Sequence, residues 1–163
     1  MYNRLTESSI WLDLDKCPGS QVLFCQTVNA IIELYDPIDK LRSVDSRNWH
    51  DHYHLASWIH KVVMDCCFSP TSFLGAYIYL KRYAEKVVIT PDNVKRYFCG
   101  ACVLSEAFFE DNYIHPKHIC AVAFPGRSQS TFNAETATIL KALDFKGWIS
   151  RPDFFATVRS VLD

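Results

Sequence analysis

Histidines and cysteines are the residues of this 163-residue chain whose types and spacing could carry chemistry. His50 and His54 are four residues apart, so on a helix they would share a face and could both reach a metal ion; His52 lies between them. A zinc site needs three or four converging ligands, and neither Cys66 nor Cys67 continues a recognisable ligand spacing. We therefore predict no metal site and interpret the cluster as a solvated helix start.

Two cysteine patterns suggest thiol chemistry. Cys99 and Cys102 form a C-x-x-C pair around Gly100, but a redox pair of this kind belongs at a helix N-terminus after a strand, and this one falls in the middle of an apolar helical pattern. A glycine inside a helix costs about 1 kcal/mol and usually permits close packing, so we interpret the pair as small residues at a tight helix contact. Cys120 follows His118 without a third orienting group. We expect no catalysis and no cofactor.

Five basic residues flank two of the expected helices, and they could form a small patch for nucleic acid or a phosphopeptide: Lys81, Arg82, Lys86, Lys95 and Arg96. The whole chain has 17 basic and 18 acidic side chains and a net charge of −1. Such a balance gives no overall field that would hold nucleic acid. We therefore interpret the five residues as solvated helix ends and expect no nucleic-acid partner.

Composition favours a folded protein inside the cell. Apolar residues make up 49% of the chain and charged residues 21%, which is ordinary for a globular domain. The start of the chain is polar and mixed in charge, and no apolar run approaches the ~20 residues that a membrane span requires. Seven cysteines, several of them within apolar helical runs, indicate a reducing compartment. We expect a location in the cytoplasm, the nucleus or both, and no membrane partner.

Helix signals follow one another along the chain, and the single β-rich run, residues 87–89, is too short to compete with them. Proline after a capping residue marks several of the starts. The predicted helices cover residues 20–35, about 51–63, 70–83, 90–110, a short one from 115, about 130–144 and 151–161. The helix over 90–110 is apolar on most faces, which is typical of a central helix. We predict an all-α domain of about seven helices around it, with an N-terminal helix and connector (1–49), a main helical region (50–148) and a last helix packed on it (149–163).

The order of these features over roughly residues 50–148 resembles the cyclin box, closest to the single-box cyclins of the plant P/U type and the yeast phosphate-regulatory type. The resemblance rests on short motifs in a fixed order: Ile59-His60-Lys61, Ser69-Pro70, Tyr79 with Arg82-Tyr83, Asn93-Val94 with Arg96, Phe108 with Glu110-Asp111, and Asn133 followed by Leu140, Leu143 and Phe145. It implies the cyclin-like helical fold and a non-catalytic regulatory protein that binds and activates a cyclin-dependent protein kinase.

The resemblance departs at the positions that touch the kinase. In the family, a lysine on the central helix and a glutamate on the fifth box helix face the kinase. Here those positions fall on Ala107 and Thr136, with Glu135 one residue away, which is about 100° around a helix. Lys81 replaces the acid that usually precedes Arg82. These changes favour a second hypothesis, a cyclin-fold adaptor for a partner that is not a kinase; a third is a small metal- or thiol-dependent enzyme.

The predicted partner-binding surface is the lip formed by the helix over 90–110 and the helix over 130–144. Its residues are Ala107, Phe108, Glu110, Asp111, Glu135, Thr136, Leu140 and Phe145. The apolar members could instead belong to the core, Leu140 above all, and the acids at 110 and 111 could be a solvated helix end. The sequence leaves open whether Glu135 takes the place of the family glutamate.

Overall fold

The computed structural model describes residues 19–35, 49–144 and 146–162, and the side chains of 22–35, 54–144 and 146–162. The described residues form seven helices and no strand: α2 (Gly19–Glu33), α3 (Trp49–Asp65), α4 (Pro70–Ala84), α5 (Val94–Phe109), α6 (Pro116–Ala123), α7 (Gln129–Ala142) and α8 (Arg151–Leu162). The predicted all-α class is confirmed. None of these helices is both long and apolar enough to cross a membrane. Residues 1–18 and 36–48, part of the predicted N-terminal region and connector, lie outside the described residues.

Two helices begin where their capping residues predict. Ser69 has extended backbone angles (φ −70°, ψ 159°), and its Oγ accepts a hydrogen bond from the Ser72 amide at 3.1 Å. Pro70 follows at the first helical position, where its missing N–H removes no helical hydrogen bond. His115 caps α6 in the same way, because its Nδ1 accepts from the Lys117 amide at 3.1 Å.

The α5 helix begins later than the predicted Thr90-Pro91 start. Residues 91–93 form a turn, and α5 begins at Val94. Asn93 holds this turn with both ends of its side chain: Oδ1 accepts from the Thr90 amide at 2.8 Å, and Nδ2 donates to the Val88 carbonyl at 3.1 Å. The Thr90 carbonyl accepts from the amides of Asn93 and Val94 at 3.2 and 3.0 Å, so the turn leads directly into α5.

Helix α7 begins one residue before the predicted alternatives, Ser130 and Thr131. Ser128 is the cap, since its Oγ accepts from the Thr131 amide at 3.2 Å. Ser128, Ser130 and Thr131 all carry a hydroxyl group, and because each of them is a good N-cap, the exact cap was ambiguous in the sequence.

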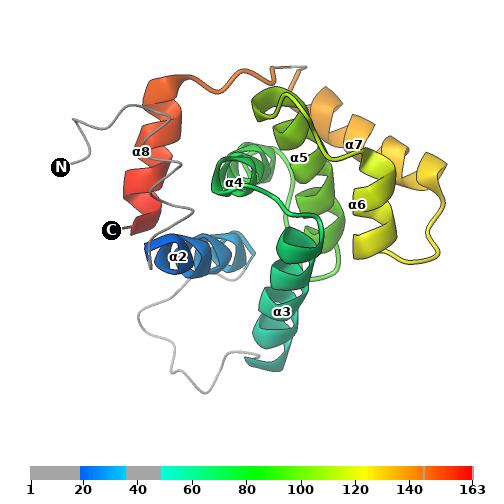
Figure 1. Ribbon diagram of the computed structural model, residues 1–163, viewed down its shortest axis with the longest axis horizontal. Coiled ribbons are helices and arrows are strands. Elements are labelled where there is room, and N and C mark those ends of the chain that lie inside the picture. The colour runs from blue at the N-terminus through cyan, green and yellow to red at the C-terminus, as the bar shows by residue number, and fades with distance from the viewer. Residues whose placement is uncertain (1–18, 36–48, 145, 163) are drawn as a thin grey trace.

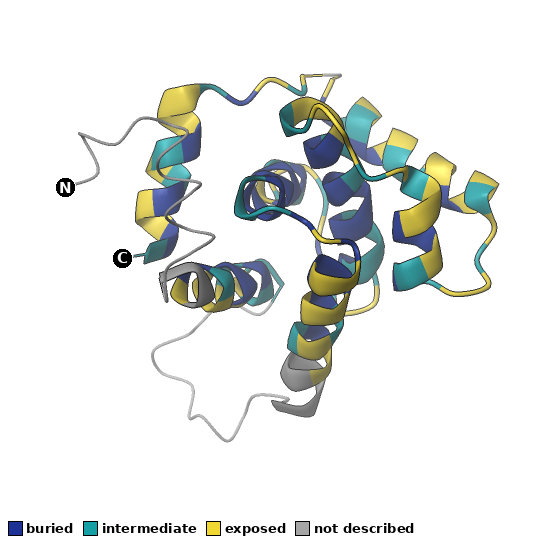
Figure 2. Ribbon diagram, viewed as in Figure 1, coloured by how far each residue is buried: buried dark blue, intermediate teal, exposed yellow. Residues whose placement is uncertain are grey.

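Helix α4 lies at the centre of the arrangement, with α2, α5 and α8 packed around it (Figure 1). Every residue from Ser72 to Leu80 is buried, and Figure 2 shows α4 buried nearly all round. Helix α5 packs on α4 with one face and on α6 and α7 with others. The centre is therefore shared by α4 and α5, and the buried apolar side chains of all seven helices join one cluster.

Glycines set the distance at the two main crossings of α5. A Cβ placed on Gly75 of α4 would overlap Ser105 Oγ and stand 2.5 Å from Phe109 Cε2. A Cβ on Gly100 of α5 would overlap Ile139 Cδ1 of α7. The helix backbones can approach this closely only because both positions lack a side chain. The interpretation of Cys99-Gly100-Ala101-Cys102 as a tight helix contact is confirmed.

Candidate protein-binding surface

The last turns of α5 expose apolar side chains. Ala107 is exposed and Phe108 keeps 37% of its surface exposed, whereas every other residue of α5 is buried or half-buried. Leu104, half-buried, is on the same face because it lies one turn before Phe108. The Phe108 ring packs edge-to-face against Trp148, with 5.7 Å between the ring centres. We call Leu104, Ala107, Phe108 and Trp148 the aromatic lip.

Sequence reasoning missed Trp148, which is 72% exposed. It lies in the connector between α7 and α8, forty residues after Phe108, so no helical period could pair the two rings. The feature of the sequence that could have indicated it is that this tryptophan lies outside the apolar face of every predicted helix. Such a residue either fills a gap in the core or offers its ring to a partner, and the sequence cannot distinguish these roles.

The connector that carries Trp148 is fastened to α4. The Tyr79 hydroxyl donates to the Gly147 carbonyl, and Arg82 Nη1 donates to the Trp148 carbonyl at 2.8 Å. Arg82 also pairs with Asp153 at the start of α8 at 3.7 Å. The Tyr79-x-x-Arg82 pattern therefore joins α4 to the connector and the start of α8, which lie more than sixty residues later in the sequence.

The acids at the end of α5 meet the N-terminus of α4. Glu110 Oε1 accepts from Ser69 Oγ at 2.5 Å, so this predicted site residue is half-buried and already has a partner in the chain. Asp111 is exposed. Glu106, which the sequence analysis did not single out, is 2% exposed and accepts from Ser72 Oγ at 2.5 Å and from the Ile114 amide at 3.0 Å. Carboxylates near a helix N-terminus are stabilised by its dipole.

Glu135 is paired with Arg127 of the same chain. Both of its carboxylate oxygens accept from Arg127 Nη1, at 2.9 and 3.0 Å, and the guanidinium lies 4.0 Å from the centre of the Phe124 ring. This contact joins α7 to the turn after α6. Only 17% of the Glu135 side chain is exposed, so its charge is directed inward to Arg127.

The other predicted residues of α7 lie at the crossing with α5. The Thr136 Oγ1 donates to the Phe132 carbonyl at 3.2 Å, and the Thr136 Cα is 3.4 Å from the Cβ position of Gly100. Gly100 precedes Phe108 by eight residues, or about 12 Å along α5. Leu140, one turn further along α7, is half-buried. Phe145 lies outside the described residues.

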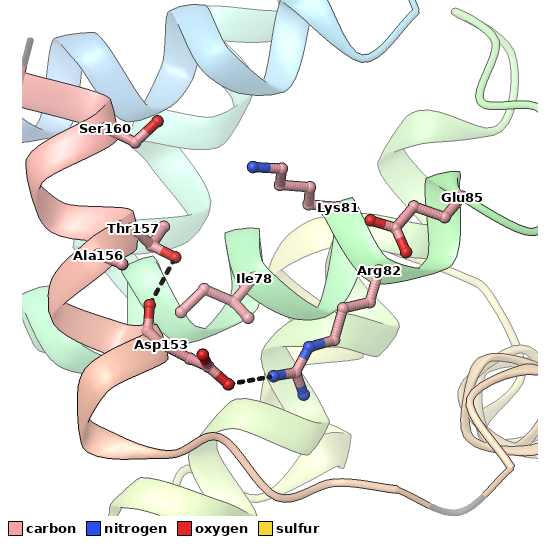
Figure 3. A pocket seen from close by; sticks show the side chains of 8 residues that line it. All are labelled: Ile78, Lys81, Arg82, Glu85, Asp153, Ala156, Thr157 and Ser160. Atoms are coloured by element: carbon pink, nitrogen blue, oxygen red, sulfur yellow. Dashed lines mark hydrogen bonds and ion pairs between the residues drawn. The ribbon is translucent and has the colours of Figure 1, made fainter.

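The five basic residues of the possible patch do not gather on one surface. Lys86 pairs with Asp144 at 3.2 Å, and Lys95 and Arg96 lie over aromatic rings. Lys81 and Arg82 line a groove of about 470 Å³ between α4 and α8, with Glu85, Asp153, Thr157 and Ser160 among its other residues (Figure 3). The groove walls carry two cationic and two anionic side chains, so the charges of the groove itself are balanced.

The buried thiols are poorly suited to nucleophilic chemistry. Burial raises the pKa of Cys99 and of Cys102 well above the usual value for a thiol. Burial raises the pKa of Cys66 to about 11, and it raises that of Cys120 although Arg127 acts in the opposite direction. A thiol nucleophile needs the opposite shift, because the thiolate is the reactive form.

Alkylation should separate the described cysteines into two classes. We expect iodoacetamide at pH 8 to label the exposed Cys25 and Cys67 in the folded protein, and to label the four buried cysteines, Cys66, Cys99, Cys102 and Cys120, only after denaturation. Peptide mass spectrometry measures both sets. Rapid labelling of Cys99 or Cys102 in the native protein would contradict their placement in the core.

The positions of the histidine, cysteine and acidic side chains bear on metal binding. No group of three His, Cys, Asp or Glu side chains within the described part of the chain is arranged to hold a metal ion. His50 and His52 lie outside the residues whose side chains are described, and His54 is exposed.

A scan against protein-family models and searches of curated proteins and of solved structures all found no match. The cyclin resemblance therefore stays a prediction from the sequence.

Proposed function

We propose that this chain is a non-catalytic regulatory protein that binds a partner protein through the aromatic lip. The observation that carries the proposal is the exposure of Phe108 beside a second exposed ring, Trp148, at the end of a helix on which only Ala107 and Phe108 are exposed. Adjacent exposed apolar side chains mark interaction surfaces. Large aromatic side chains also supply much of the binding energy at protein interfaces.

Cyclin-dependent protein kinases are the first partner class to test, and the protein would activate the kinase that it binds. The sequence resemblance points to this class, and the charge at the lip is compatible with it. Ala107 stands where the family has a lysine, so the lip brings no charge that an interface would leave unpaired. A kinase helix could pack on the lip if its own face were apolar.

The second candidate is an adaptor that binds a protein other than a kinase. One contact favours it: Arg127 holds Glu135, so the acid nearest to the family glutamate is paired within the chain. A partner that depends on that glutamate would have to break a partly buried ion pair.

Replacing Phe108 by alanine should weaken partner binding at least tenfold while leaving the fold intact. Truncating an aromatic anchor typically costs about 2 kcal/mol of binding free energy, whereas a partly exposed ring contributes less to folding. Binding of purified cyclin-dependent kinases can be measured by isothermal titration, and stability by urea unfolding.

Met64→Ala is the matched control, because Met64 is a large exposed apolar residue on α3 rather than on the lip. The control should bind as tightly as the unaltered chain. If a kinase binds the Phe108→Ala and Met64→Ala variants equally well, the lip is not its binding surface.

A further inference from the structure

We infer that Trp148 is a partner-contacting residue of the aromatic lip, and that Tyr79 and Arg82 are positioning residues that hold it there. The contact with a partner rests on the proposed function, whereas the positioning is a property of the chain alone. The partner surface that fits is apolar and uncharged, with a recess for an indole ring.

The positioning role follows from the acceptors of the two hydrogen bonds. Both Tyr79 and Arg82 donate to backbone carbonyls, of Gly147 and Trp148, so they fix the main chain and leave the indole ring free to face outward. Edge-to-face packing on Phe108 orients the ring. A surface loop without such contacts would let the tryptophan sample many conformations.

Both positioning side chains are themselves fixed. Tyr79 is buried, and burial raises the pKa of its hydroxyl to about 12, although the nearby Arg82 acts to lower it. The hydroxyl therefore stays protonated and able to donate at any physiological pH. Arg82 is held on its other side by Asp153, at the edge of the groove between α4 and α8 (Figure 3).

A fixed, exposed tryptophan favours binding because little conformational freedom remains to be lost. Ordering a mobile side chain at an interface reduces affinity, and preorganisation removes that penalty. The network that holds the main chain at Trp148 uses one buried hydroxyl and one half-buried guanidinium.

The chemistry of the partner follows from the charges of the lip. Leu104, Ala107, Phe108 and Trp148 carry none. A charged side chain of the partner placed against them would be buried without a counterion, and such a group strongly opposes association. The lip therefore selects an apolar surface, such as one face of an amphipathic helix.

Nuclear magnetic relaxation of the isolated ¹⁵N-labelled protein tests the positioning. In the unaltered chain the Trp148 amide should have an order parameter of about 0.85, as in rigid backbone. In the double variant Tyr79→Phe/Arg82→Gln the order parameter of the Trp148 amide should fall below about 0.6, while the order parameters of the α5 amides should not change. Single Arg82→Gln, which keeps the Tyr79 hydroxyl, should give an intermediate value if the double variant does not fold.

Lys86→Gln is the matched control, because Lys86 also joins α4 to the segment after α7, through Asp144, but does not contact the Trp148 carbonyl. The control should leave Trp148 ordered. If the Trp148 amide stays ordered in both the single and the double variant, Tyr79 and Arg82 are not positioning residues. The same conclusion follows if the Trp148 amide is as mobile in the Lys86→Gln control as in the double variant.

Titration of a cyclin-dependent kinase against Trp148→Ala and Phe108→Ala separates this inference from the proposed function. We expect both variants to bind at least tenfold more weakly than the unaltered chain. If only Phe108→Ala loses binding, Trp148 is not a contact and the proposed function stands. If the unaltered chain binds no kinase, the kinase proposal and the Trp148 contact to it both fail, and relaxation alone decides the positioning.

Discussion

Replacing Glu106 by alanine is expected to lower the free energy of unfolding by about 3 kcal/mol, since each buried group left without a hydrogen-bond partner costs about 1–3 kcal/mol. The carboxylate is almost completely buried and accepts from the Ser72 hydroxyl and the Ile114 amide. Both donors would lose their acceptor. Ile114 lies in the loop after α5, so the same change should also loosen the loop that follows the lip.

Two other variants show whether hydrogen bonding is the cause. Glu106→Gln keeps one acceptor oxygen and should lose less stability than the alanine variant. Glu110→Ala removes a carboxylate one turn later that has a single partner, Ser69, and is less buried, so its effect should be smaller still. Urea unfolding measures all three, and equal losses for Glu106→Ala and Glu110→Ala would contradict the account.

Replacing Gly75 by valine should destabilise the protein by about 3 kcal/mol, at the upper end of typical overpacking penalties. Any Cβ at this position would overlap Ser105 Oγ and the Phe109 ring. Ser105 cannot move aside freely, because its hydroxyl donates to the Ser72 carbonyl at 2.6 Å. The α4–α5 crossing would have to widen, and α4 lies at the centre of the fold.

Gly147→Ala is the control for this change. The nearest atom to a Cβ at Gly147 is the Tyr79 hydroxyl oxygen at 3.8 Å, an ordinary contact distance, so alanine should fit. Thermal or urea unfolding compares the two variants. A Gly75→Val protein that unfolds at the same urea concentration as the unaltered chain would show that α4 and α5 do not cross at this glycine.

Local signals predicted the all-α class and several helix starts. Ser69 and His115 cap their helices with their own side chains, so a few neighbouring residues are enough to predict where each of these helices begins. The start of α5 was predicted three to four residues too early: residues 91–93 form a turn that leads into the helix at Val94, and the apolar pattern does not distinguish such a turn from the first turn of a helix.

The candidate site was less predictable because its contacts join distant segments. Phe108 and Trp148 meet across forty residues, and Glu106 faces Ser72 of another helix. Periodicity shows which face of a helix is apolar, but not which loop will pack on its end. Glu135 stood beside the family position in sequence, yet its carboxylate is paired with Arg127 in the turn after α6.

Affinity purification from the native cell, with three baits read side by side by mass spectrometry, tests the central claim most directly. The baits are the unaltered chain, Phe108→Ala and the Met64→Ala control. We predict that a protein kinase is enriched on the unaltered chain and on Met64→Ala, and is lost from Phe108→Ala. The same proteins on all three baits, or no protein enriched on the unaltered chain, would contradict the proposal that the aromatic lip binds a regulatory partner.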